Sequence, residues 1–309
     1  MVADERAAKP LLGYLNPQYA ASLGEFGSPR ELPNAGGWLL ERHILDSPYR
    51  DAMGCYPLFC CQNWDALKTD LATHCENLVS VALVTDPFGE YAAADLKRSF
   101  DSVVHFKEHF VVDLAKPGPI GVPHHRKYAR YALAHMEIHI ARNPLDSLDD
   151  WGRLYDCLIA RRRLSGIKAF SREAFRRQLS LPGAVLFLAS RYGTIVGGNI
   201  WFVQNDVAYG HLLAMDEAGY RLRAAYALTH AALEHMRKLA RWASLGGYPG
   251  ADPRRGAGLA TFKAGWATGT RTALLCGRIL QPERYAELAR RTGTEGVSYF
   301  PAYRSGELA

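Results

Sequence analysis

The stretch that decides the fold is residues 198–247, which read GNIWFVQNDVAYGHLLAMDEAGYRLRAAYALTHAALEHMRKLARWASLGG. It begins with an apolar, β-rich run at 200–203, and turn residues separate this run from a second extended run at 207–215. From Leu222 the apolar residues recur at the spacing of one helix face, and a further extended run follows at 242–245. The predicted order is therefore strand, turn, strand, loop, helix, strand.

The loop before this helix carries two arginines, Arg221 and Arg223. A helix N-terminus presents unpaired N–H groups that attract an anion. The two guanidinium groups add positive charge beside them, which suits a pyrophosphate. An ordinary strand–helix–strand connection with solvated arginines has the same residues, and it is the order of the elements that favours the anion site.

Three short motifs surround the helix: GYR at 219–221, LGG at 245–247 and FKAGW at 262–266. In this order they make residues 151–285 resemble the core of the Gcn5-related N-acetyltransferase (GNAT) superfamily, and more closely its two-lobed FemAB-like branch. In that superfamily the loop before the helix usually reads Arg/Gln-x-x-Gly-x-Gly/Ala. Here residues 221–225 read RLRAA, so an alanine, Ala224, stands where the first glycine is usual.

The resemblance implies the fold class α/β (α+β), with a GNAT-like mixed sheet flanked by helices in two tandem lobes. Asn143-Pro144 punctuates the chain and marks the expected boundary. We therefore predict an N-terminal GNAT-like lobe at residues 1–144 with an irregular lead-in, and a C-terminal acyltransferase lobe at residues 145–309.

Composition fits a globular protein with a preference for anionic partners. The 309 residues carry a formal net charge of +6 and are 22% charged and 48% hydrophobic. The six cysteines form no Cys-x-x-Cys pair, which favours reduced thiols and a cytoplasmic location. Because the sequence has neither a signal-peptide pattern nor an apolar run of about 18 residues, we expect no membrane partner.

The remaining elements follow from periodicity and turn residues. Residues 1–40 have little periodicity and are expected to form the irregular lead-in, and a basic helix is expected to open at 124–130. Further helices are predicted at 64–71, 92–100, 151–163, 259–267 and 282–291, and another is predicted to begin after Ser171 as its cap. Further strands are predicted at 78–84, 103–114, 184–191, 195–203 and 271–280.

One metal motif is present but is interpreted as a strand. Residues 105–109 read HFKEH, which matches the His-x-x-Glu-His pattern of some zinc peptidases. The flanking valines favour an extended chain, in which residues four apart lie about 13 Å from each other and cannot share one metal ion. We therefore expect no metal site. Nucleophile-elbow, Walker and Rossmann patterns are missing too, which argues against hydrolase, nucleotide triphosphatase and dehydrogenase functions.

Candidate catalytic residues lie on the strand 207–215. Strand alternation predicts that Tyr209, His211 and Leu213 share one face. The ordinary pKa of histidine, near 6.5, suits His211 to accept a proton from an attacking amine, although a buried histidine bonded to a neighbouring carbonyl fits the same pattern. Tyr226, early in the helix, is a candidate to protonate a departing thiolate, or else a core tyrosine.

The resemblance implies an N-acyltransferase that moves an acyl group, expected to be acetyl, from acyl-CoA to the amine of a small metabolite by direct attack. The donor would lie in a gap between the strands 207–215 and 242–245 and against the helix start. Its expected contacts are Leu213, Met215, Arg221, Arg223, Ala224, Ala225 and Tyr226. The acceptor would enter a groove between the lobes, lined by Tyr209, His211, Lys263 and Trp266, with Trp201 as a further substrate contact.

Two alternatives stay open at this point. FemAB-like relatives use aminoacyl-tRNA as the donor, and the basic charge of the chain permits that reaction. A non-catalytic binding module that keeps the fold is the other alternative. It predicts neither stabilisation by acyl-CoA nor transfer to any amine.

Overall fold

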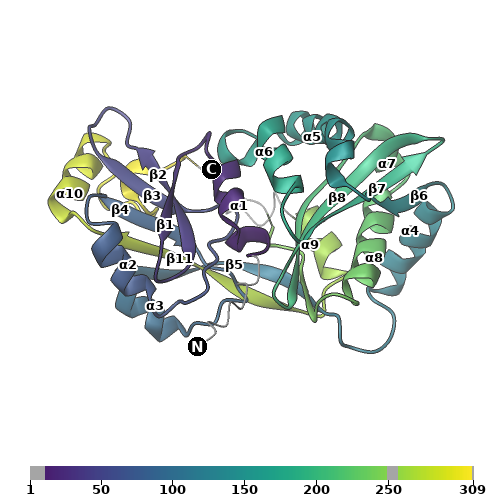
Figure 1. The fold of residues 1–309 in the computed structure, drawn as a ribbon, viewed down its shortest axis with the longest axis horizontal. Helices are drawn as coiled ribbons and strands as arrows, with labels where there is room; N and C mark the ends of the chain where they lie inside the picture. Colours follow the sequence, from purple (N-terminus) through teal and green to yellow (C-terminus); the bar gives the residue numbers. More distant parts are fainter. Residues whose placement is uncertain (1–10, 249–256, 308–309) are drawn as a thin grey trace, which may run out of the picture.

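The computed structural model describes residues 11–248 and 257–307. Within these ranges one sheet runs through the whole molecule, in the strand order β1-β2-β3-β4-β11-β5-β10-β9-β8-β7-β6, and helices cover it (Figure 1). The strands are β1 (Ser28–Leu32), β2 (Gly37–His43), β3 (Arg50–Gly54), β4 (Ser80–Val84), β5 (Ser102–Asp113), β6 (Glu137–Ile140), β7 (Ala184–Arg191), β8 (Thr194–Gln204), β9 (Val207–Met215), β10 (Trp242–Ser244) and β11 (Gly269–Ile279). The predicted mixed sheet flanked by helices is confirmed.

Ten α-helices are present in the described ranges. They are α1 (Pro17–Ser22), α2 (Leu67–His74), α3 (Ala93–Ser99), α4 (Pro123–Leu133), α5 (Leu148–Arg162), α6 (Arg172–Leu179), α7 (Glu217–Arg221), α8 (Ala224–Met236), α9 (Ala257–Ala264) and α10 (Pro282–Arg291). Short 3-10 turns occur at Gly13–Leu15, Pro144–Ser147, Gly166–Lys168 and Ala302–Arg304.

The stretch 198–247 folds in the predicted order. β7, β8 and β9 form an antiparallel meander, and α8 leads from β9 to the parallel strand β10. The first hairpin turns at Tyr192 and Gly193, which both have positive φ angles, as the tight two-residue hairpin turn requires. The loop predicted before α8 contains the short helix α7. Asp216 caps it by accepting a hydrogen bond from the Gly219 N–H.

The two halves of the sheet exchange elements. β11 lies between β4 and β5 and is antiparallel to both, so a late segment completes the half built from early residues. In return, β6 pairs with β7 at the far edge, and α4 packs against α8. The boundary at residue 144 stays a prediction, but the strand order does not divide there.

The expected irregular lead-in is the clearest difference from the sequence prediction. Residues 1–10 lie outside the described ranges, but residues 11–40 contain α1, β1 and most of β2. The α1 segment is buried rather than loose, because Tyr19 and Leu23 are fully inaccessible to solvent. This segment packs against α6 and the meander, so it is part of the core.

The core of the meander half has two sides, separated by the sheet. On one side, called the α6 face, β7–β9 pack against α1, α5 and α6. On the other side, called the α8 face, the same strands pack against α8 and α4 (Figure 1). Any site on these strands therefore opens to one face or the other.

Candidate functional site

The sheet opens between β9 and β10. These parallel strands pair over three residues only, and the last pair joins Tyr209 to Ser244. Beyond it the chain turns toward β5, because Leu245 N–H donates to the Phe110 carbonyl at 2.9 Å. In the described ranges no strand pairs with this edge of β9 from Gly210 onward. The opening, at the expected gap, leaves backbone groups available to another extended molecule.

A β-bulge at the opening changes which face each side chain takes. Ile200 pairs with Leu212 and Trp201 pairs with Gly210, so His211 is an extra residue in β9. Leu213 consequently packs on the α8 face, whereas Leu212 packs on the α6 face. The prediction that Leu213 shares a face with Tyr209 and His211 is wrong, because simple alternation ignores the bulge.

On the α6 face, His211 is held inside the protein by both ring nitrogens. Nδ1 lies 3.1 Å from the Tyr14 hydroxyl, and Nε2 lies 3.2 Å from Gln178 Oε1. Because an amide oxygen only accepts, Nε2 carries the proton and Nδ1 accepts from the tyrosine. Burial lowers the pKa of His211 to about 3. The arrangement argues against the predicted proton-accepting role, since neither ring nitrogen is left for an acceptor amine.

Tyr209 is also engaged on the α6 face. Its hydroxyl donates to Asp86 Oδ2 at 2.7 Å, and Asp86 accepts further bonds from the Phe88 N–H at 3.0 Å and the Cys60 thiol at 3.5 Å. Burial raises the pKa of Asp86. This buried carboxyl, which was not among the predicted site residues, connects the end of β4 to β9.

The α8 face brings most of the predicted donor and acceptor contacts together. One hydrophobic cluster contains the predicted site residues Trp201, Leu213, Met215, Ala224, Ala225, Tyr226 and Trp266. The Trp201 ring lies beside the opening, 3.4 Å from the position that a Cβ on Gly210 would take. Tyr209 and His211 are not in this group, so the expected groove with Trp266 is divided by the sheet.

Helix α9 adds an aromatic wall to this face. The Tyr226 ring centroid lies 5.0 Å from that of Phe262 and 5.1 Å from that of His125. The His125 and Trp266 rings are also 5.1 Å apart, in an edge-to-face arrangement. The wall therefore joins α4, α8 and α9, and of its members only Tyr226 and Trp266 were predicted as site residues.

Several buried ring nitrogens on the α8 face lack a partner among the residues described. They are His125 Nδ1, Trp201 Nε1, His230 Nδ1 and Trp266 Nε1. Leaving such a group unpaired in a folded protein costs about 1–3 kcal/mol. Clustered exceptions of this kind require an explanation, for which bound water or a ligand with polar atoms is suitable.

Lys263 brings positive charge to the end of β10. Its Nζ donates to the Gly247 carbonyl at 2.5 Å, and Lys107 Nζ donates to the next carbonyl, that of Tyr248, at 3.4 Å. Burial and the nearby charge of Lys107 lower the pKa of Lys263 to about 7. Burial and both lysines also lower the pKa of His109 to about 3. Across residues 11–248 and 257–307, neither lysine has a carboxylate in an ion pair, so an anion is electrostatically favoured here.

Lys107, one of these two lysines, belongs to the HFKEH stretch. Residues 105–109 lie on β5, as predicted, and Lys107 and His109 are two apart, so they share a side of the strand. The sequence prediction considered the stretch only as a metal motif. Its lysine could have been found only with the pairing of β5 to β10 in hand, because that pairing brings it next to Lys263.

The start of α8 is uncapped, but its arginines are already engaged. Arg223 occupies the N-cap position in the left-handed conformation, with φ 61°, and no side chain caps the helix. The Arg223 guanidinium lies 3.4 Å from the centroid of the Tyr128 ring, and Arg221 pairs with Glu217 at 2.9 Å. A donor phosphate here would have to share or displace these partners.

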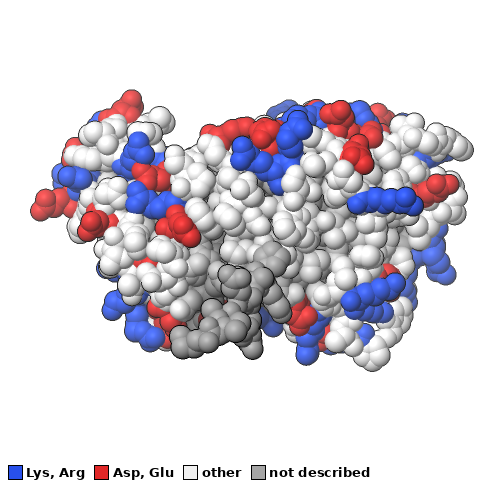
Figure 2. Space-filling model, viewed as in Figure 1, with Lys and Arg blue, Asp and Glu red and all other residues white. Residues whose placement is uncertain are grey.

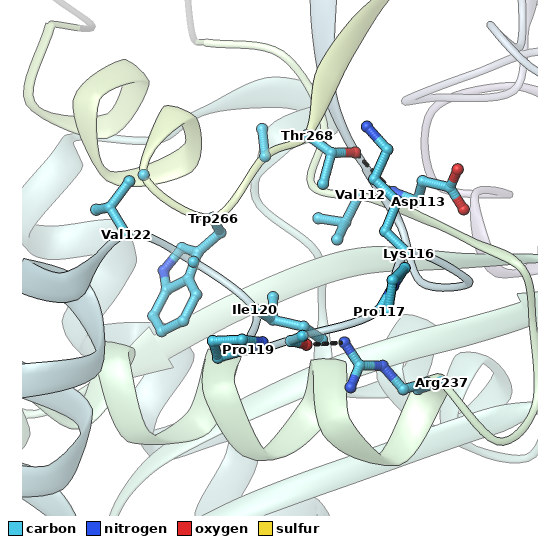
Figure 3. A pocket seen from close by; sticks show the side chains of 14 residues that line it. Val112, Asp113, Lys116, Pro117, Pro119, Ile120, Val122, Arg237, Trp266 and Thr268 are labelled. Atoms are coloured by element: carbon cyan, nitrogen blue, oxygen red, sulfur yellow. Dashed lines mark hydrogen bonds between the residues drawn. The ribbon is translucent and has the colours of Figure 1, made fainter.

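A cavity of about 240 Å³ lies near the other end of α8. The loop 116–122, Arg237 and the segment 265–268 enclose it, and Figure 3 shows Trp266 on its wall and Arg237 bonded to the loop. Of the predicted site residues only Trp266 reaches it. The residues 221–226 do not line this cavity, so it does not coincide with the expected donor site.

Comparisons with known proteins show which folds this chain is similar to. Residues 124–253 match the family model of the acetyltransferase (GNAT) domain. The structure of FemX is similar with a TM-score of 0.66 and 13% identity, over 88% of this chain and 93% of that one.

Two further solved structures are similar over most of their length. The C-terminal DUF2156 domain of a candidate lysylphosphatidylglycerol synthetase from Agrobacterium fabrum has a TM-score of 0.60 and 16% identity, over 91% of this chain and 93% of that one. L-PGS from Bacillus licheniformis has a TM-score of 0.58 and 15% identity, over 86% and 92%. No curated protein matches the chain.

Proposed function

Because the chain has a GNAT-superfamily, FemAB-like fold, we propose that it is an acyltransferase that moves an aminoacyl group from aminoacyl-tRNA to an amine and forms an amide bond. The observation that carries the proposal is the opening between β9 and β10, with Lys263 beside it. The unpaired edge of β9 offers backbone groups to an extended acyl donor, and the lysine offers charge to an anionic one.

The choice of donor rests on the start of α8. Ala224 and Tyr226 stand at the two positions where the superfamily usually has small residues, and Arg223 already stacks on Tyr128. Both features make this turn less suited to the pyrophosphate of coenzyme A. The FemAB-like branch that the sequence resembles uses aminoacyl-tRNA, and the similarity to FemX extends over most of both chains.

The proposed reaction needs no covalent enzyme intermediate. The nitrogen of the acceptor amine attacks the ester carbonyl carbon, the new C–N bond forms, and the ester C–O bond to the tRNA breaks. The amine loses one proton and the departing hydroxyl oxygen gains one. Backbone N–H groups of β9 beyond Gly210 would stabilise the negative carbonyl oxygen. Tyr226, on the α8 face, is the proposed proton donor to the departing oxygen.

Lys263 has two uses in this scheme, set by its pKa of about 7. The charged form binds phosphate or the developing oxyanion, and the neutral form accepts the proton that the amine loses. Trp201 and Trp266 lie on the same face but are fully buried, so they pack behind the proposed site and do not themselves contact the acceptor.

Acyl-CoA is the second candidate donor, and a specific observation favours it. The family model that matches residues 124–253 is that of an acetyltransferase domain, and the α8 start carries no side-chain cap. With this donor, Leu213, Met215, Ala224 and Ala225 would line the pantetheine arm, while Arg221 and Arg223 would approach the pyrophosphate. The amine of a small metabolite would be acetylated.

Parallel binding measurements distinguish the donors. We expect deacylated tRNA to raise the melting temperature and to shift in a native gel, with binding that weakens steeply as salt rises. Acetyl-CoA is expected to leave the melting temperature unchanged. Stabilisation by acetyl-CoA alone would replace the first donor with the second.

A transfer assay tests the chemistry itself. Bulk tRNA charged with radiolabelled amino acids is incubated with the protein and a panel of primary amines, and the label that becomes stable to mild alkali is counted. Amide products are expected because amides survive the treatment that cleaves the ester. No transfer from either donor, together with no stabilisation by either, would support the non-catalytic binding module instead.

A further inference from the structure

Helix α4 presents its basic residues to solvent and His125 to the protein interior. It packs against α8, and no helix within residues 11–248 and 257–307 is long and apolar enough to cross a membrane. Lys127 and Arg130 are exposed, and Figure 2 shows that Lys and Arg side chains predominate where Figure 1 places α4 and α8. His125 is only 4% exposed, so its contacts lie inside the protein.

Two hydrogen bonds join the start of α4 to the end of α9. His125 Nε2 lies 3.0 Å from the Phe262 carbonyl oxygen, and the Val122 N–H donates to the Gly265 carbonyl at 2.8 Å. Because a carbonyl oxygen only accepts, the proton of His125 is on Nε2. Carbonyl groups in the last turn of a helix have no partner within that helix. His125 therefore supplies the donor that the Phe262 carbonyl would otherwise lack.

The glycine of the FKAGW stretch makes room for this contact. A Cβ on Gly265 would lie 2.2 Å from His125 Cε1 and 2.3 Å from His125 Nε2, which is closer than non-bonded atoms can approach. Any larger residue at this position would therefore push the imidazole ring away from α9. Lys263 and Trp266 were the residues predicted from this stretch, and the structure adds a reason for its glycine.

Helix α9 packs only lightly on the rest of the molecule. None of its residues, all of which the structure describes, is buried. Its Phe262 ring contacts the rings of His125 and Tyr226, at centroid distances of 5.8 Å and 5.0 Å. The same helix carries Lys263, whose Nζ donates to the Gly247 carbonyl at 2.5 Å. The position of the Lys263 ammonium group therefore depends on how α9 is attached to α4.

We propose that His125 is a positioning residue, which holds α9 so that the Lys263 ammonium group stays at the end of β10. The inference rests on the proposed function, which assigns anion binding and proton transfer to Lys263. Without the Nε2–H donor, α9 would keep the backbone bond at Gly265 but would be free to turn away at Phe262. Lys263 would then exchange part of its protein surroundings for water.

The titration of Lys263 tests the proposal without any transfer reaction. The full chain is made with ¹³C-labelled lysine, the Cε chemical shifts are followed against pH by NMR, and the Lys263 signal is identified by its loss in Lys263→Arg. In the parent we expect a midpoint at about 7, because burial and the charge of Lys107 lower the pKa of Lys263. Lys107 and His109 on β5 face the same ammonium group, and every variant below keeps both. A parent midpoint near the ordinary value of about 10.4 would already overturn the proposal, because Lys263 would be hydrated with His125 in place.

His125→Phe keeps an aromatic ring at this position but removes the N–H donor. It should raise the Lys263 midpoint by about one unit, a tenfold change in acidity, because a more hydrated ammonium group holds its proton more tightly. His125→Gln keeps an N–H donor of similar reach, so its midpoint should stay within about 0.3 unit of the parent. Gly265→Ala displaces the imidazole ring and should shift the midpoint in the same direction as His125→Phe.

His124→Phe is the matched control, because it makes the same substitution at the preceding residue. His124 is exposed, and its ring packs on that of Tyr128 with 4.2 Å between the centroids. This variant should change the Lys263 midpoint by less than about 0.3 unit. In the transfer assay, His125→Phe should lower the rate about tenfold, whereas His125→Gln and His124→Phe should lower it less than about threefold.

Three results with the variants would overturn the proposal. They are a midpoint in His125→Phe less than about 0.5 unit above the parent, an equal shift in His125→Gln or His124→Phe, and a melting temperature of His125→Phe more than about 4 °C below the parent. The last result would assign His125 to the stability of the whole fold. The titration and the transfer assay fail separately. A shifted midpoint in a protein that transfers no aminoacyl group removes the proposed function, and transfer with an unchanged midpoint removes the role of His125.

Discussion

The two faces of the meander treat buried polar groups differently. On the α6 face, Tyr209 and His211 are bonded to Asp86, Tyr14 and Gln178, and their hydrogen-bonding groups are satisfied inside the protein. On the α8 face, ring nitrogens of His125, Trp201, His230 and Trp266 have no partner among the described residues. Trp151 Nε1, on α5, is the exception on the first face.

This difference suggests that the α6 face contributes to stability and the α8 face to function. A satisfied polar network holds elements together and has no atoms left for a substrate. An unsatisfied one, beside a lysine whose pKa is about 7, has atoms available and charge that responds to pH. The α8 face is therefore the better candidate for chemistry, and substitutions at four residues can sharpen or break the contrast.

The largest effect is expected from Lys263→Ala. Removing the ammonium should lower the rate of amide formation by about 100-fold or more, as the loss of a positioned oxyanion donor does. The measurement is the initial rate with charged tRNA at saturating amine. A rate within about threefold of the parent would remove the α8 face as the reaction site.

The pH dependence of donor binding shows whether the charge of Lys263 matters, and it distinguishes a loss of that charge from unfolding of the protein. A charged Lys263 binds an anion, so donor affinity should fall as pH rises through about 7, and Lys263→Arg should abolish that dependence. Because the folded-state pKa is below its ordinary value, the unfolded chain holds the proton more tightly between pH 7 and about 10.5. Below pH 7 the lysine is charged in the folded protein, and burial of that charge destabilises the fold. Lys263→Ala removes this cost, so the variant is not expected to unfold.

A medium effect, on stability alone, is expected from Tyr209→Phe. The substitution leaves the buried Asp86 carboxyl without one of its donors, which should cost about 2 kcal/mol of unfolding free energy. Urea denaturation measures it, and the transfer rate of the folded fraction should stay within about threefold. A large loss of rate at unchanged stability would move the chemistry to the α6 face.

Tyr226→Phe is the matched control, because it removes a tyrosine hydroxyl from the α8 face as Tyr209→Phe does from the α6 face. The Tyr226 hydroxyl bonds to no residue in the described ranges, so its loss should change stability by less than about 0.5 kcal/mol. As the proposed proton donor, it should lower the transfer rate about tenfold or more.

The smallest effect concerns acid stability and His211→Gln. The folded-state pKa of His211 is about 3 and the unfolded value is near 6.5, so only the unfolded chain gains the proton as pH falls through this range. Stability is then lost on acidification, by about 1.4 kcal/mol at about pH 5.5 for this residue. Melting curves should show a shallower fall with acid in the variant. An identical fall in parent and variant would mean that His211 is protonated in the folded state.

Local pattern predicted the elements of the α/β core well. The alternation in β7–β9 and the helical spacing of α8 are determined by neighbours in the chain, and these elements were confirmed within a few residues. The short strands β1, β2, β3 and β6 were not predicted, because each is only four to seven residues long and has little alternation of its own. Their stability comes from partners distant in sequence.

The candidate site depends on contacts that no local pattern contains. The bulge at His211 is set by the register between β8 and β9, and it moves Leu213 to the opposite face. Lys107 reaches Lys263 only because β5 lies beside β10. Residue types were therefore predictable at the opening, whereas their assignment to the two faces was not.

The position of β11 has a consequence for the newly made chain. β4 and β5 are synthesised early, yet the strand that joins them comes from residues 269–279. Until those residues leave the ribosome, both strands expose unpaired edges, which invite association with other chains. Folding of this half must wait for residues 269–279, so we expect a strong requirement for chaperones during translation and aggregation of any product that stops before residue 269.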